Sequence, residues 1–196
     1  IDALCPEREF LPRDPMARSK AVSTLAWMNN TVHPTFTHVF MPQKYHPDAG
    51  VQEQIRAQAV MQYGLLLDEL QQLVQNAQTS GQAWLSGKRW GPLDSYALTL
   101  TRWGSMVGHN PEARPALWAH VQKTAAEPGV ARTIERERLT LGVDTHATLG
   151  LKLPTKGLDA LLRRDGGRLL ILGLLYLDFR FGSRFGRIDN DLNFLI

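Results

Sequence analysis

The sequence predicts an all-α protein, a bundle of about five helices over residues 13–138 followed by an irregular C-terminal tail. Three observations support this fold class. Apolar residues recur at intervals of three and four, which is the period of a helix packed on one side. Proline follows a residue suited to capping at several points, as it does at helix starts. No segment alternates apolar and polar residues as a half-buried strand would.

The first helix is expected to begin at Asp14, whose carboxylate suits the N-cap, with Pro15 at the first helical position. One apolar stripe then continues to about Phe40. Pro34 interrupts this stripe, and the loss of one backbone hydrogen bond there predicts a bend rather than an end. The stripe consists of Ala21, Leu25, Met28, Val32, Phe36 and Val39.

The second helix is expected from Asp48 to about Asn76, followed by a Gly-bounded loop that carries two tryptophans over residues 79–90. The pair Gly91-Pro92 starts a third helix. Apolar residues cover nearly every side of this helix between residues 96 and 107, which predicts that it is the buried centre of the bundle.

Two shorter helices complete the bundle. Asn110-Pro111 and Pro115 open one of them, and Glu127-Pro128 opens the other, which runs towards Arg138. Over residues 139–196 the capping residues vanish and glycines recur, so we expect a poorly packed tail with at most short helices near 158–163 and 169–177. The alternative is an appended element that covers a surface of the bundle.

Composition excludes several classes of protein. The chain has 196 residues and a net charge of +3, and its basic residues are scattered, so we expect no nucleic-acid partner. The single cysteine, Cys5, cannot form an internal disulfide, and no Cys/His spacing predicts a metal site. The longest apolar run is about half a membrane span, so we expect no membrane partner and a cytoplasmic protein.

The order of these features resembles the helical C-terminal domain of cytosolic glutathione transferases, with the bacterial beta class as the nearest fit. The resemblance rests on the bent first helix, the Trp-Leu-Ser-Gly loop, the Arg-Trp pair at residues 102–103 and the Glu-Pro-Gly-Val step at residues 127–130. Its most specific part is the stretch His-Pro-Thr-Phe-Thr-His-Val-Phe-Met-Pro at residues 33–42. The match covers roughly residues 1–138.

The resemblance implies a division of labour. Such enzymes join a thioredoxin-like domain that binds glutathione to a helical domain that forms most of the pocket for an electrophilic second substrate, and they are usually homodimers. Residues 1–12 resemble the end of the first domain and its linker, and residues 13–138 resemble the helical domain. We therefore expect the glutathione-binding strands to be missing and the chain alone to be inactive. The alternative is a noncatalytic helical interaction or dimerisation module.

The resemblance also implies site residues, with glutathione as co-substrate and no metal. His33 matches a histidine that faces the substrate cleft, where an imidazole could donate to a leaving group or hold the thiolate. Its alternative role is that of a histidine at a helix kink, bonded to a neighbouring carbonyl. Phe36, Trp103 and Met106 would line an apolar substrate pocket, and simple core packing is the alternative for all three.

Asp94 is expected to cap the third helix rather than to act in chemistry. In the resembling family an Asp at this point forms a capping box with a Ser or Thr three residues earlier, and this chain has Gly91 there. One side-chain acceptor is therefore expected to be absent. Replacement of a good cap residue by glycine costs only a few tenths of a kcal/mol, so the helix start should survive.

Overall fold

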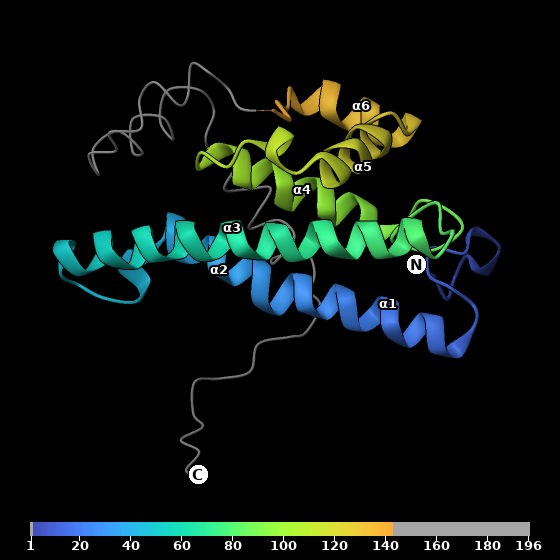
Figure 1. Cartoon of the computed structure of the whole chain (residues 1–196), viewed down its shortest axis with the longest axis horizontal. Coiled ribbons are helices and arrows are strands. Elements are labelled where there is room, and N and C mark those ends of the chain that lie inside the picture. The colour runs from blue at the N-terminus through green and yellow to red at the C-terminus, as the bar shows by residue number, and fades with distance from the viewer. Residues whose placement is uncertain (1, 143–196) are drawn as a thin grey trace, which may run out of the picture. The chain divides into compact units, whose positions relative to one another are not determined.

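The fold, seen in a computed structural model that describes residues 2–142, consists of helices only (Figure 1). A π turn joins α1 and α2 into one continuous bent helix. Counted this way, the six labelled helices of the described residues correspond to the five that the sequence predicts, and these residues contain no strand. The all-α prediction is confirmed. The short helices expected near 158–163 and 169–177 lie outside the described residues. The helices are α1 (Pro15–Trp27), α2 (His33–Phe40), α3 (Ala49–Thr79), α4 (Pro92–Met106), α5 (Pro115–Ala125) and α6 (Pro128–Glu137).

Local capping starts the first and third of these helices. The Asp14 carboxylate accepts a hydrogen bond from the backbone N–H of Ala17 at 2.8 Å. The Asp48 carboxylate does the same for Val51 at 2.9 Å. Each bond satisfies one of the backbone donors that a helix N-terminus leaves without a partner.

The bend between α1 and α2 is a π turn over Met28–Val32, in which the N–H of His33 bonds to the carbonyl of Met28, five residues earlier. The helix continues past Pro34, as expected. The distortion includes Asn30, the residue whose carbonyl Pro34 leaves without its usual helical hydrogen bond, and so lies on the N-terminal side of the proline. A π turn adds one residue to the helical turn and is itself a recognised cause of kinks, so it changes the direction in which the side chains after it project.

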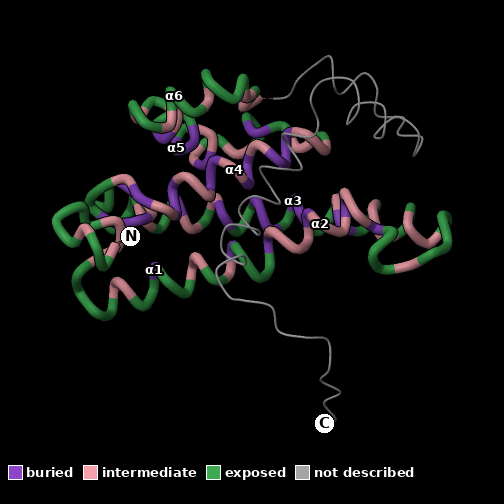
Figure 2. Tube along the Cα trace, turned by 180° about the vertical axis from the view of Figure 1, so that it is seen from behind, coloured by how far each residue is buried: buried purple, intermediate pink, exposed green. Residues whose placement is uncertain are grey.

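Helix α4 forms the centre of the bundle, as the sequence predicts. It packs against α1, α3 and α5, and nine of its residues are buried. Figure 2 shows buried residues along α4 and along the facing sides of α3 and α5, whereas α6 and much of α1 are exposed. Tyr63 lies in this core with no exposed surface, and its hydroxyl donates to the carbonyl of Leu100 at 2.8 Å.

Two glycines allow close contact at this core. A Cβ added to Gly104 of α4 would lie 2.5 Å from Leu67 Cδ1 of α3, and one added to Gly64 of α3 would lie 2.7 Å from the ring of His109. Both distances are shorter than van der Waals contact. Gly104 therefore allows α4 to approach α3 closely, and Gly64 makes room on α3 for the ring of His109, which follows α4.

We predict that Gly104→Ala lowers the free energy of unfolding by about 1–3 kcal/mol, because overpacking of the core outweighs the higher helix propensity of alanine. Gly129→Ala is the matched control, since Gly129 lies in exposed α6 and an added Cβ meets nothing within 4 Å. This control should be neutral or more stable by up to about 1 kcal/mol. Urea unfolding of both variants measures the effect, and equal stability of the two would contradict the close approach.

Candidate functional site

An aromatic cluster fills the junction of α2, α3 and α4. The rings of Phe36 and Trp103 stack with centroids 4.8 Å apart and planes 13° apart. The ring of Tyr63 packs 5.1 Å from Phe36 on the core side. Only 4% of Phe36 and 5% of Trp103 is exposed, so both residues contribute to core packing whatever else they do.

His33 lies at the edge of this cluster and is half-buried. Its ring meets the indole of Trp103 edge to face, with centroids 4.9 Å apart and an interplanar angle of 85°. Its Nδ1 atom lies 2.8 Å from the hydroxyl of Tyr96, a residue of α4. The hydroxyl also lies 3.5 Å from Asn29 Oδ1 in the π turn. A polar pair, His33 and Tyr96, thus borders an apolar wall.

The structure brings together three of the residues that the sequence analysis selected, His33, Phe36 and Trp103. It places Met106 one turn beyond Trp103, half-buried at the C-terminal end of α4. Sequence reasoning did not select Tyr96. Its spacing of seven residues before Trp103, two helical turns on the same face, is the signal that would have linked the two.

Asp94 is the centre of a second, fully buried cluster. Its carboxylate accepts hydrogen bonds from three backbone N–H groups, those of Leu85 at 2.8 Å, Gly91 at 2.9 Å and Ser86 at 3.3 Å. His120 of α5 places Nε2 2.9 Å from the same carboxylate. These contacts join the loop before α4, the first turn of α4 and the middle of α5.

Ser86 supplies the acceptor that Gly91 lacks. Its hydroxyl accepts a hydrogen bond from the N–H of Leu93, the second residue of α4, at 3.2 Å. A Cβ on Gly91 would lie 2.6 Å from that hydroxyl oxygen and 2.5 Å from the carbonyl oxygen of Phe10. Gly91 itself supplies no side-chain acceptor, as expected, and the helix start survives because Ser86 of the preceding loop accepts a hydrogen bond there instead.

The cluster lowers the pKa of Asp94. Burial raises the pKa of this carboxyl, but the nearby His120 ring, Ser86 and the hydrogen bond from the Gly91 backbone outweigh burial and hold the pKa below its ordinary value. The folded state therefore binds the proton more weakly than the unfolded chain does. The carboxylate's contribution to stability is complete above the unfolded-state pKa of about 3.9 and is lost as the pH falls through the folded-state pKa.

We predict that Asp94→Asn lowers the free energy of unfolding at pH 7 by about 3–5 kcal/mol. The substitution removes the negative charge with which the buried partners of Asp94 interact. The same substitution at exposed Asp48 is the control and should cost less than about 1 kcal/mol, since Asn is an equally good N-cap. Urea unfolding from pH 7 to pH 3 measures both. Asp94→Asn should also reduce the loss of unfolding free energy between pH 7 and pH 3. An unchanged loss over this range would refute the lowered pKa of Asp94.

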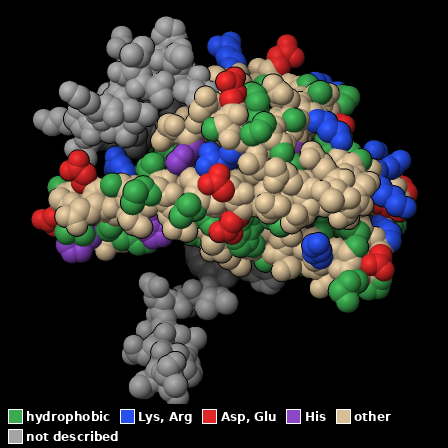
Figure 3. All heavy atoms as spheres, in the orientation of Figure 1, with side chains coloured by type: hydrophobic (Ala, Val, Ile, Leu, Met, Phe, Trp, Pro, Cys, Tyr) green, Lys and Arg blue, Asp and Glu red, His purple; other side chains and the backbone are tan. Residues whose placement is uncertain are grey.

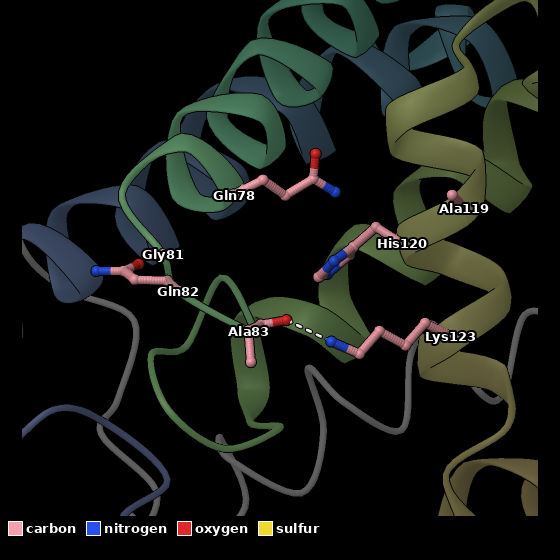
Figure 4. A pocket seen from close by; sticks show the side chains of 7 residues that line it. All are labelled: Gln78, Gly81, Gln82, Ala83, Ala119, His120 and Lys123. Atoms are coloured by element: carbon pink, nitrogen blue, oxygen red, sulfur yellow. Dashed lines mark hydrogen bonds between the residues drawn. The ribbon is translucent and has the colours of Figure 1, made fainter.

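A cavity of about 390 Å³ lies beside this cluster (Figure 4). The end of α3, the turn after it and α5 surround the cavity, which has His120 and Lys123 on its α5 side. The Lys123 ammonium donates to the carbonyl of Ala83 at 2.6 Å and lies 3.9 Å from the centroid of the Trp84 ring. Both polar residues on this wall therefore already hold the loop in place.

The surface carries no concentrated charge on the face that Figure 3 shows, where basic and acidic side chains are interspersed over the helices. Within residues 2–142 no cluster of three or more His, Cys, Asp or Glu side chains could hold a metal ion. None of the helices in this part of the chain has the length and apolarity needed to cross a membrane.

The fold is similar to that of a glutathione transferase homolog from Sulfitobacter, which was crystallised with bound glutathione. The two chains are 18% identical, with a TM-score of 0.62. The match covers 71% of this chain and 64% of the Sulfitobacter chain, so the likeness spans less than two thirds of that protein and shows the fold alone. No protein-family model matches the chain, and no curated protein matches it significantly.

Proposed function

We propose that residues 13–138 are the helical domain of a glutathione transferase and form the pocket for its electrophilic second substrate. The observation that carries this proposal is the cluster of His33, Phe36 and Trp103 at one junction of a bundle with this fold. On this proposal the groups that bind glutathione lie outside the described residues. Homodimerisation stays a prediction from the resemblance, and a cytoplasmic location stays a prediction from the sequence.

The apolar part of the cluster suits an aryl or similarly flat electrophile. Phe36 and Trp103 stack nearly parallel and are almost wholly buried, so they form a rigid apolar backing behind the His33 ring and offer a ligand only their exposed edges. Met106, half-buried at the end of the same helix, adds a flexible apolar side chain at the rim. Pockets for small ligands combine such walls with a few polar groups.

The polar part of the cluster suits the charge that develops in the reaction. A glutathione thiolate attacks an electrophilic carbon, the new carbon–sulfur bond forms, and the leaving group departs with negative charge. An imidazole N–H of His33 can donate to that leaving group or to the sulfur. A neutral thiol is a weak nucleophile, with a free pKa of about 8.5, so donors to the thiolate increase the reactive fraction.

We predict that the purified chain binds S-(2,4-dinitrophenyl)glutathione and that His33→Ala weakens this binding about two- to tenfold, which is the usual worth of one hydrogen bond. His38→Ala is the matched control, because His38 lies on the same helix but bonds to the Pro34 carbonyl and stacks on Tyr45. Isothermal titration measures all three dissociation constants. Turnover of glutathione with an aryl halide by the chain alone should not exceed the uncatalysed rate.

Three outcomes would count against the proposal. Equal weakening by the two substitutions would show that His33 acts only through folding. An effect of His33→Ala on melting temperature without an effect on affinity would favour the role of a kink histidine. No binding by the wild-type chain would favour the alternative, a noncatalytic helical interaction module.

A further inference from the structure

The cavity beside α5 has a buried histidine in its wall. His120 is only 5% exposed, and Figure 4 shows its ring pointing into the cavity. The Trp84 indole packs against this ring at 73°, with centroids 5.9 Å apart, and so restrains its orientation. Lys123 follows three residues later on the same side of α5. One wall of the cavity therefore carries an imidazole and an ammonium group.

Asp94 determines which nitrogen of the neutral His120 ring carries the proton. Nε2 lies 2.9 Å from a carboxylate oxygen of Asp94, and an ionised carboxylate only accepts hydrogen bonds. Two acceptors at this distance would repel each other, so Nε2 holds the proton and Nδ1 is an acceptor. Within residues 2–142 no hydrogen-bond donor reaches Nδ1. An acceptor in a buried residue costs free energy unless a donor satisfies it.

Lys123 has capacity left for an anionic group. Its ammonium has three N–H donors, of which one bonds to the Ala83 carbonyl at 2.6 Å. The Trp84 ring, 3.9 Å away, adds a cation–π contact but no negative charge. No carboxylate in the described part of the chain forms an ion pair with Lys123. The charge of this side chain is therefore available to a ligand in the cavity.

We propose that this cavity binds a small hydroxycarboxylate, whose hydroxyl donates to Nδ1 of His120 while its carboxylate pairs with the ammonium of Lys123. The hydroxyl supplies the proton that Nδ1 lacks, and the carboxylate supplies the charge that Lys123 lacks. Gln78, whose side chain points into the same cavity, offers amide N–H donors to the carboxylate.

The same wall disfavours the two nearest classes of ligand. A plain carboxylate has no proton to donate, so Nδ1 would stay without a partner when it binds. An α-amino acid carries an ammonium group in place of the hydroxyl, and that group would lie beside the ammonium of Lys123, where like charges repel. This site shares no residue with the junction of α2 and α4, so the inference does not rest on the proposed function.

NMR titration of the ¹⁵N-labelled wild-type chain with lactate, propionate and alanine at pH 8 tests the proposal. The three probes differ only in the group that would meet Nδ1. Lactate should shift the signals of the His120 ring and the Trp84 indole, and it should bind about two- to tenfold more tightly than propionate, the usual effect of one hydrogen bond. Alanine should bind more weakly than lactate. Equal affinity for lactate and either other probe, or no shift at His120, would overturn the proposal.

The variant Lys123→Gln should weaken lactate binding about two- to fivefold, because it removes one partner of an ion pair at the surface. Lys88→Gln is the matched control, since Lys88 lies exposed in the loop that Lys123 contacts but does not line the cavity. Equal lactate affinity of the two variants would contradict the site. Urea unfolding shows whether Lys123→Gln still folds, and if it does not, the comparison of lactate with propionate on the wild-type chain decides.

Discussion

The carboxylate of Asp94 is the interaction on which the rest of the structure depends. A buried charge is costly unless hydrogen bonds and an opposite charge or dipole satisfy it, and Asp94 has three backbone donors and His120. These partners fix the preceding loop and α5 to the first turn of α4. Since Tyr96 and Trp103 follow on the same helix, this buried anion sets where the candidate site's α4 residues lie.

The second constraint is the π turn between α1 and α2. It lets one apolar stripe continue through the bend while it places Asn29 and His33 near the Tyr96 hydroxyl. A regular helix would carry the side chains after the turn in another direction, because each turn would hold fewer residues. The junction therefore combines a rigid core contact, Phe36 on Trp103, with a polar pair at its edge.

The features that the sequence predicted are those set by local chemistry. Asp14 and Asp48 cap helices through bonds to residues three positions later, and such signals are readable from a short window. The apolar stripe likewise placed Phe36 on a core-facing side, and the apolar residues on nearly every side of residues 96–107 placed Trp103 in a buried helix. Their contact at one junction was expected only through the resemblance to a known family. Periodicity predicts which face of a helix is buried but not which helix packs against that face.

The features that the sequence did not predict depend on residues distant along the chain or in another element. Ser86 replaces the side chain missing at Gly91 only because the loop folds back onto the helix start. Tyr96 belongs to the candidate site because its hydroxyl contacts His33, which lies 63 positions away in the sequence. The π turn has no capping side chain that a sequence pattern could reveal. Pro34 predicted a bend in the helix but did not predict that the bend is a π turn.

The central claim is that a ligand of a glutathione transferase occupies the junction of α2 and α4. Chemical-shift mapping with S-(2,4-dinitrophenyl)glutathione tests it most directly, because the five tryptophan indoles of the chain lie in different places. The largest shifts should fall on the Trp103 indole and the His33 ring, with little change at Trp84. Largest shifts at Trp84 and His120, beside the cavity on α5, would contradict it.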